Sequence, residues 1–384
     1  MGESPRSIFA LAYGIAVQEL RSCYDDLGIV AGRHHYDDYW TRDAAFAWLG
    51  ALELGDGDVV GKHLAFLCSL QRKDGMIPFL VRKHLPGLSG LGVKIKISFR
   101  PKFRSHKALF LSEVIDSNPF FVIGLIGFLE KMRGDDVILN VFGTHLDRAR
   151  QWCLEKVGED GLVREGFLAG WNDGILKSGA TLLNNVLFYR ALDLWRETDT
   201  RFAETADRIK GALQRDFFNG RYFIDWIDRR PHDHFDSIAN FLAVLWGVAD
   251  LEQAEKILDF ALERMFTPPF VRTAFPLYDP SRVELGNRIA GISGYWGGTM
   301  YWVEPACLFA MALAAAGRRT EALRVIEGLA ELIVRHQGIY EVYEREKETA
   351  EFRPIRWRIF RSEYPFARSS GLYIFACHQL GIRY

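Results

Sequence analysis

The sequence predicts an all-α fold in which paired helices form a closed ring of two concentric layers. Helical periodicity dominates the chain, and two kinds of helical segment alternate along it. Residues 302–316 are apolar on nearly every side, whereas residues 319–335 carry their apolar side chains on one face. A helix that is apolar all round must be buried, and an amphipathic helix can cover it. The alternation therefore predicts six inner and six outer helices, the arrangement known as an (α/α)6 toroid.

The same periodicity predicts about twelve helices. In chain order they span residues 5–24, 43–54, 57–71, 118–132, 142–156, 179–197, 201–216, 236–247, 251–265, 299–316, 319–335 and 366–380. A weak internal repeat follows four of the outer helices, at Asp74-Gly75, Asp160-Gly161, Asn219-Gly220 and Gln337-Gly338. Glycine after the last helical turn is a C-cap signal, and the β-prone residues that follow predict short extended pieces at one rim. The alternative is four unrelated helix ends.

Two stretches interrupt the helical rhythm. Residues 75–112 contain eight Lys and Arg and no Asp or Glu, and residues 93–100 within them alternate as a strand would. Residues 266–298 are rich in Pro and Gly and show no clear helical pattern. Long insertions in a compact domain are usually lids or binding loops, so we expect both stretches to be lids. No linker divides the chain, and residues 1–384 are expected to form one catalytic domain.

Composition excludes several classes of function. The chain has a formal net charge of −1, which gives it no general attraction to nucleic acid or membranes. Its five cysteines are scattered, with no C-x-x-C pair, so neither a disulfide framework nor a zinc site is expected. Reduced thiols suit the cytosol. The spaced apolar residues at the N-terminus predict a first helix rather than a signal peptide, and no apolar run is long enough to span a membrane. We therefore expect a soluble, cytoplasmic protein.

Carboxylates beside aromatic residues mark the candidate site. The first group is Tyr36-Asp37-Asp38-Tyr39-Trp40-Thr41-Arg42-Asp43, which leads into an apolar inner helix. Arg42 is a planar donor fork and Asp43 an acceptor, so together they could hold neighbouring sugar hydroxyls beside the Trp40 ring. The alternative is that Thr41 or Asp43 only caps the helix.

The second and third groups also lie at predicted helix starts. Asp116, followed by Ser117-Asn118-Pro119, could simply cap the next inner helix. Asp173 stands between Trp171-Asn172 and a glycine. A carboxyl group in such an apolar, partly dry place has a raised pKa, which a general acid needs, although an ordinary Asp-Gly turn is the alternative.

The fourth group is a predicted short strand, Ile339-Tyr340-Glu341-Val342-Tyr343-Glu344. Alternation places Glu341 on the face opposite Tyr340, and Glu344 is the substitute if Glu341 faces outward. The histidine pairs His34-His35 and His232-His234 lack a second pair at ligand spacing, so no metal site is expected. Taken together, the groups supply the two carboxyl groups that glycoside hydrolysis requires on either side of the scissile bond.

The order of these motifs resembles the catalytic toroid of inverting α-glycosidases. It is similar to the processing α-glucosidases of glycoside hydrolase family 63, to the glucosidase half of glycogen debranching enzyme and, more distantly, to glucoamylases. The resemblance is carried by Trp40-Thr41-Arg42-Asp43, Asp116-Ser117, Trp171-Asn172-Asp173 with Asn184 to Leu192, Asp236 to Phe241, Tyr295 to Trp302, and Tyr340 to Tyr343. It therefore extends over nearly the whole chain.

The resemblance implies a role for each matching residue. Asp173 would be the general acid and Glu341 the general base, and no cofactor would be needed. Arg42 and Asp43 would hold the sugar in the cleaved subsite. The other candidate substrate-binding residues are Tyr36, Trp40, Asp116, Trp171, Asn172, Trp296, Trp302 and Tyr340. Inversion would require roughly 6.5–9.5 Å between the two carboxyl groups, with a water between them.

Two departures from the family bear on the substrate. Gly297 stands where family 63 enzymes usually have arginine, which leaves the sugar preference open. The chain has no room for the β-sandwich domain of many relatives, so it looks like a minimal toroid for a small soluble substrate. The cytosolic hydrolases of glucosylglycerate and mannosylglycerate are similar minimal toroids. The basic stretch at residues 94–107 could accordingly hold an anionic aglycone, or it could be a solvated hairpin or face an acidic neighbour in an oligomer.

Other functions are compatible with parts of this pattern. A sugar isomerase or 2-epimerase shares the ring and the size, but relies on histidines, which the recognisable motifs lack. A helical-repeat module that binds protein would show a fixed short repeat, and the glycine turns are irregularly spaced. A toroid that only binds sugar would look the same in sequence.

Overall fold

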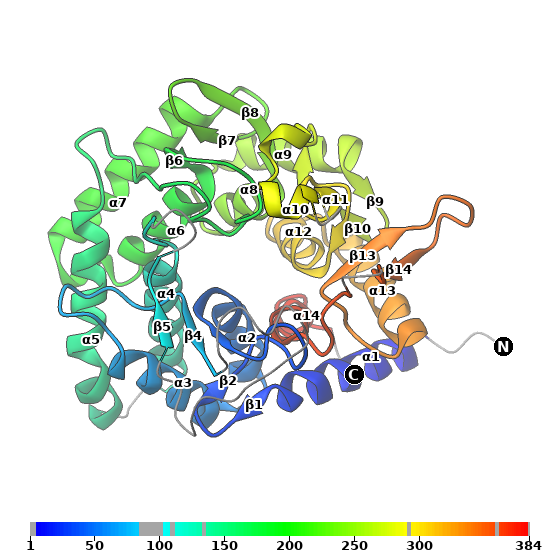
Figure 1. The fold of residues 1–384 in the computed structure, drawn as a ribbon, viewed down its shortest axis with the longest axis horizontal. Helices are drawn as coiled ribbons and strands as arrows, with labels where there is room; N and C mark the ends of the chain where they lie inside the picture. The colour runs from blue at the N-terminus through cyan, green and yellow to red at the C-terminus, as the bar shows by residue number, and fades with distance from the viewer. Residues whose placement is uncertain are drawn as a thin grey trace.

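The helices wind into a ring around a central axis (Figure 1). The computed structural model describes residues 5–83, 103–107, 112–132, 136–289, 293–357 and 361–382. The helices nearest the axis are α2 (Thr41–Glu53), α4 (Ser117–Lys131), α6 (Leu182–Asp193), α8 (Ser237–Leu245), α12 (Val303–Ala315) and α14 (Ala367–Gln379). Each packs against the next, and α14 packs against α2. The predicted helical ring is therefore confirmed.

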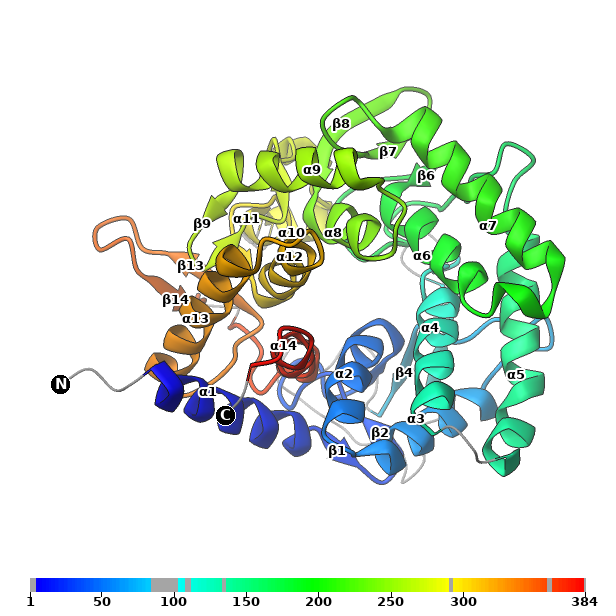
Figure 2. The same ribbon diagram turned by 180° about the vertical axis from the view of Figure 1, so that it is seen from behind.

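A second set of helices surrounds the first (Figure 2). It consists of α1 (Pro5–Ser22), α3 (Gly57–Ser69), α5 (Asp136–Glu155), α7 (Thr200–Ala212), α9 (Leu251–Arg264) and α13 (Arg319–His336). The two sets differ as their sequences predict. Helix α12 is buried continuously from Val303 to Leu313, whereas α13 buries the apolar face that includes Val325 and Leu329. Every predicted helix overlaps one of these twelve elements.

The ring closes where two glycines let the backbones of α2 and α14 approach. A Cβ atom at Gly50 would lie 2.4 Å from the carbonyl oxygen of Gly371, and one at Gly371 would lie 2.6 Å from the Cα of Ala47. Neither distance is compatible with a side chain, so glycine is required on both helices. This contact joins the first inner helix to the last.

Short β-sheets lie at the rim of the ring where the inner helices begin. One joins β3 (Tyr39–Trp40), β4 (Leu80–Arg82) and β5 (Phe103–Ser105), and another joins β12 (Tyr301–Trp302), β13 (Val342–Arg345) and β14 (Phe352–Pro354). A third contains β6 (Ala180–Thr181), β7 (Ile224–Ile227), β8 (Pro231–Asp236) and β11 (Ala274–Phe275). Two small hairpins pair β1 (Tyr24–Asp25) with β2 (Gly28–Ile29), and β9 (Phe266–Thr267) with β10 (Phe270–Val271). Strands β3, β6, β8 and β12 each run directly into an inner helix.

The predicted internal repeat is a structural one. Asn118, Asn185 and Asn240 lie in the first turns of α4, α6 and α8. The side-chain oxygen of each accepts the backbone N–H of Ile77, Val163 or Phe223, two or three residues after a turn glycine. Each amide nitrogen returns a bond to a carbonyl of the same turn segment. The fourth turn differs, because the N–H of Ile339 is bound by Glu19 of α1 instead.

The two stretches that interrupt the helical rhythm, the cysteines and the membrane-span expectation can also be compared with the structure. The predicted strand at residues 93–100 lies outside the described residues. The stretch at 266–298 is less irregular than expected, since α10 (Leu285–Ile289) and α11 (Ser293–Trp296) form within it. All five cysteines are free and buried. Within the described ranges, no helix combines the length and the apolar character needed to cross a membrane.

Candidate active site

A small pocket at the rim gathers most of the residues that the sequence singled out. Its volume is ≈ 130 Å³. The residues that line it are Tyr36, Trp40, Arg42, Asp43, Trp171, Asp173, Trp302, Glu341, Phe366 and Arg368. They come from the first, third and fourth of the predicted groups, from Trp302 and from the start of α14. The structure therefore brings Asp173 and Glu341 into one cavity with Arg42 and Asp43.

Three inner helices build this pocket with the same local pattern. An aromatic residue in extended conformation precedes the first turn of α2, α12 and α14, as Trp40, Trp302 and Phe366. A charged residue follows two positions later, as Arg42, Glu304 and Arg368. Because the inner helices begin at one rim, the pattern gives the pocket aromatic walls over buried charges.

Arg42 is the cation at the centre of the acidic groups. It lies 2.8 Å from Asp116 and 3.8 Å from Asp173, and both Arg42 and Asp116 are buried. Burial opposes the charge on the guanidinium, but Asp116, Asp173 and Asp43 outweigh it and raise the Arg42 pKa. Asp116 does not line the pocket. It lies behind Arg42 and fixes the direction of the guanidinium.

Asp173 has the properties of a proton donor. Burial raises its pKa to about 6, nearby Asp116 and Asp43 act in the same direction, and Arg42 opposes them. The side chain is still 36% exposed, on the side that faces the pocket. A carboxyl group of this kind is partly protonated near neutrality and can be reached by a ligand.

Glu341 lines the pocket and is otherwise buried. It is 3% exposed, and its backbone N–H donates to the carbonyl of Glu363 at 3.1 Å. The N–H of Glu363 in turn approaches Oε2 of Glu341 at 3.4 Å. Glu344 accepts a bond from the indole of Trp357 and lines a different hollow of ≈ 1040 Å³. Of the two candidate bases, Glu341 is the one in the pocket.

Arg368 and Phe366 are pocket residues that the sequence reasoning missed. Arg368 is buried between two carboxylates, 3.8 Å from Asp43 and 3.4 Å from Glu304. Glu304 is fully buried and also accepts a bond from Ser369. Burial raises the Glu304 pKa, and Arg368 opposes this. The spacing of the aromatic and charged residues shared with Trp40 and Arg42 is the signal that could have identified both.

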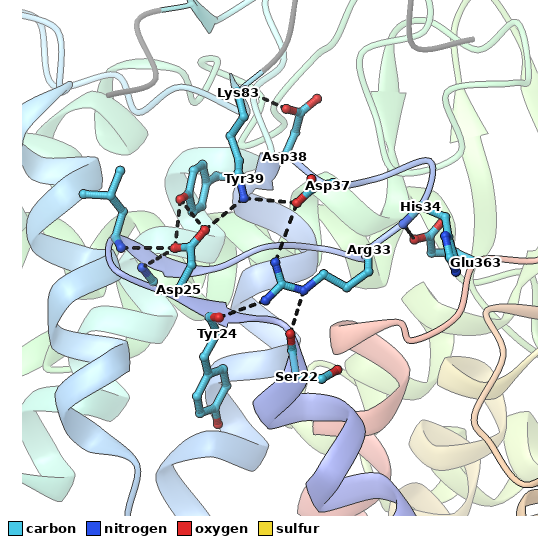
Figure 3. A network of polar contacts seen from close by, with 12 residues as sticks. Ser22, Tyr24, Asp25, Arg33, His34, Asp37, Asp38, Tyr39, Lys83 and Glu363 are labelled. Atoms are coloured by element: carbon cyan, nitrogen blue, oxygen red, sulfur yellow. Dashed lines mark hydrogen bonds and ion pairs between the residues drawn. The ribbon is translucent and has the colours of Figure 1, made fainter. Parts of the chain in front are cut away.

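The loop that carries Tyr36 is held by a polar network (Figure 3). The carboxylate of Glu363 accepts the backbone N–H groups of His34 and His35 at 2.6 and 2.7 Å. Lys83 bonds Asp25 and Asp37 with its ammonium group, while its backbone N–H donates to Asp38. Glu363 thus connects the loop that carries Tyr36 to Glu341, with which it also forms backbone contacts.

Of the remaining candidates, Trp171 and Trp302 line the pocket, whereas Asn172 and Tyr340 do not. Trp171 donates its indole N–H to Asp236 at 2.9 Å and meets Trp302 edge to face. Asn172 lines a neighbouring cavity of ≈ 20 Å³ behind Trp171. Tyr340 faces away from the pocket and stacks on Tyr364. Trp296 ends α11, but its side chain lies outside the described part of the structure.

Histidines are not among the pocket residues. His34 and His35 line an adjoining hollow, and His232 and His234 stack on Trp226. In the part of the chain that the structure describes, no three His, Cys, Asp or Glu side chains are grouped closely enough to hold a metal ion.

Solved structures share this fold over nearly the whole chain. A glycosidase aligns with a TM-score of 0.70 and 13% identity, over 99% of both chains. The GH63 mannosylglycerate hydrolase from Thermus thermophilus, in complex with Tris and D-glycerate, aligns with a TM-score of 0.67 and 17% identity, over 95% of this chain and 99% of that one. A rhamnosidase from Klebsiella oxytoca with rhamnose bound aligns at 0.68 and 16% identity, over 100% of this chain and 65% of that one. No protein-family model and no curated sequence matches the chain. The chain therefore has the ring fold of these glycoside hydrolases, at sequence identities of 13–17%.

Proposed function

We propose that the protein is an inverting glycoside hydrolase that cleaves an α-linked glucoside or mannoside of a small soluble substrate. The observation that carries the proposal is the pocket in which Asp173 and Glu341 meet Arg42, Asp43 and aromatic walls. The reaction needs no cofactor. We further assign the ring to the (α/α)6 class, as one catalytic domain. The free, buried cysteines support a reducing compartment, and we propose the cytoplasm.

Asp173 is the proposed general acid. Its raised pKa keeps the proton available, and its exposed side faces the pocket. It donates this proton to the glycosidic oxygen as the bond to the anomeric carbon breaks, so the aglycone leaves as a neutral alcohol.

Glu341 is the proposed general base. It takes a proton from a water molecule, whose oxygen attacks the anomeric carbon from the face opposite the leaving group. The product sugar is released as the β-anomer. Deprotonated Asp173 and protonated Glu341 then exchange protons with solvent, which restores the enzyme.

The size of the pocket supports a single sugar unit in the cleaved subsite. Its ≈ 130 Å³ is well below the roughly 300–1,000 Å³ typical of pockets for drug-sized ligands. Arg42, Asp43 and Arg368 offer buried donors and acceptors for hydroxyl groups, and the Trp40, Trp171 and Trp302 rings offer stacking faces. A mannosylglycerate hydrolase with the same fold supports an anionic aglycone, for which we propose the basic stretch at 94–107.

The test is hydrolysis of α-glucosides and α-mannosides, including their glycerate conjugates, followed by NMR of the released anomers. We expect initial release of the β-anomer from one member of the panel. Asp173→Asn and Glu341→Gln should each lower kcat by at least about 100-fold.

Glu344→Gln is the matched control for Glu341→Gln, because it makes the same change three residues away in another hollow. It should leave kcat within about twofold, since a group outside the pocket does not contribute to the barrier. Retention of the α-anomer would contradict inversion. Interconversion of a free sugar without hydrolysis would identify an isomerase or epimerase instead.

A further inference from the structure

A second hollow lies at the opposite end of the inner helices from the pocket. Its volume is ≈ 500 Å³. Two helices contribute to both places from their two ends. In α2, Arg42 lines the pocket and Leu49 the hollow, and in α14 Arg368 lines the pocket and Phe375 the hollow. Residues of α2, α6, α8, α12 and α14 line the hollow, and Figure 2 shows these helices around the centre of the ring.

The walls of this hollow are apolar and partly open to solvent. Leu49, Trp246 and Phe375 are only partly buried although they face it. Apolar surface left open in this way gains free energy when an apolar group covers it. The volume falls within the range of roughly 300–1,000 Å³ in which protein cavities bind small organic ligands.

The charged groups at the hollow have one sign. Arg190 and Arg319 line it, and none of its lining residues within the described ranges is acidic. Arg319 donates to the carbonyl oxygen of Leu380 at 2.6 Å, which holds its guanidinium at the edge of the hollow. The site therefore combines an apolar wall with a positive edge.

Arg190 is incompletely neutralised. Its Nε is buried and has no hydrogen-bond partner among the described residues. Its ion pair with Asp193 is long, at 3.9 Å, and Asp193 is bound more closely by Arg196, at 3.0 Å. Burial lowers the pKa of Arg190, because the nearby Asp193 does not fully offset the loss of solvent around the guanidinium. An anion at the hollow would supply the compensating charge.

We propose that this hollow binds a single anionic amphiphile, a molecule with an apolar chain and a carboxylate head. The chain would lie against Leu49, Trp246 and Phe375, and the carboxylate would face Arg190 and Arg319. A neutral apolar molecule would leave the charges of the two arginines uncompensated. A sugar would not cover the apolar wall. The proposal does not depend on glycoside hydrolysis.

The test is calorimetric titration of the purified protein with decanoate below its micellar concentration, and with 1-decanol as the neutral match. We expect saturable 1:1 binding of decanoate. Arg190→Gln should weaken decanoate by about tenfold or more while leaving decanol unchanged, because only the carboxylate uses the charge. Arg201→Gln, an exposed arginine on α7, is the control and should change neither.

Ala314→Phe provides a second variant that fills the hollow and leaves both arginines in place. It should abolish binding of both compounds, and circular dichroism should confirm that each variant is folded. Absence of saturable binding to the wild-type protein would overturn the proposal. Binding that survives both Arg190→Gln and Ala314→Phe would also overturn it, because the ligand would then lie elsewhere.

Discussion

At the scale of single residues, the contacts of Arg42 show how the pocket sets the pKa of the Asp173 carboxyl group. The guanidinium lies 3.8 Å from Asp173 but 2.8 Å from Asp116, so its strongest stabilisation goes to the carboxylate that does not face the pocket. Asp173 keeps the desolvation that raises its pKa and receives only part of the compensating charge. By holding the Arg42 guanidinium, Asp116 limits how far Arg42 lowers the pKa of Asp173.

The pH dependence of kcat/KM should report this balance. A general acid works in its protonated form, so activity should fall as the pH rises through about 6, the Asp173 pKa. The measurement is kcat/KM between pH 4 and pH 9 on the best substrate of the panel. A glycosyl fluoride, whose leaving group needs little protonation, should show a much weaker decline. An equal decline for both substrates would assign the titration to another group.

At the scale of elements, the glycine turns and the inner helices act as one repeated unit. Each amide of Asn118, Asn185 and Asn240 joins the start of an inner helix to the turn segment that follows the preceding outer helix. The unit recurs because each helix pair presents the same buried N–H and carbonyl groups, which must be satisfied. The fourth position uses Glu19, a buried carboxyl group, in place of an asparagine.

Asn185→Ala should lower the free energy of unfolding by about 3 kcal/mol. The substitution leaves the buried N–H of Val163 without the acceptor that Asn185 provides, and it removes the bonds that Asn185 donates to the carbonyls of Val163 and Thr181. Urea denaturation followed by tryptophan fluorescence is the measurement. Asn287→Ala, in the exposed helix α10, should change stability by less than about 0.5 kcal/mol. Equal effects of the two variants would show that the repeated amide contact is dispensable.

Glu19 makes the stability of the fold depend on pH. Burial raises its pKa to about 8, although Ile339 and Ser370 donate bonds to it. Below about pH 4.5 the carboxyl group is protonated in both the folded and the unfolded state. Between pH 4.5 and pH 8 only the unfolded chain ionises it, so this group makes folding less favourable as the pH rises.

Glu19→Gln should therefore remove a pH-dependent loss of stability. Between pH 6 and pH 9 the wild-type carboxyl group costs on the order of 3 kcal/mol, which an amide does not. The measurement is the free energy of unfolding at both pH values. Glu331→Gln, exposed on α13, is the control and should leave the difference unchanged. A Glu19→Gln variant that loses as much stability as the wild type would assign the loss elsewhere.

The helices could be predicted from the sequence because the outer ones have a clear period of apolar positions, while inner ones such as α12 are apolar on nearly every side. The groups around Arg42, Asp173 and Glu341 could be found because each places a carboxylate beside an aromatic ring within a few residues. Arg368 carries the same local spacing as Arg42, but its place between Asp43 and Glu304 could not be predicted, since these partners are remote in sequence and only the closed ring brings them together. The direction of Asn172, behind Trp171 rather than into the pocket, likewise depends on packing.

At the scale of the whole molecule, the ring depends on the contact between α2 and α14. Gly371→Ala should lower the free energy of unfolding by at least about 3 kcal/mol, since the new Cβ meets the backbone of Ala47 rather than a movable side chain. Thermal unfolding by circular dichroism is the measurement. Gly14→Ala, in the exposed part of α1 where nothing lies near the new Cβ, should instead stabilise by about 0.5–1 kcal/mol. Tolerance of Gly371→Ala would mean that the helices can separate without opening the ring.

The contact between Gly50 and Gly371 also sets an order of events during translation. Helix α2 leaves the ribosome before α14, although the surface that covers α2 on one side belongs to α14. Until then the nascent chain is an open arc with an uncovered apolar edge, and Asp43 has no Arg368 beside it. A chain arrested before Ala367 would remain in that state, as a ready substrate for chaperones and proteases. The cell thus acquires a complete pocket only after the start of α14 has been translated.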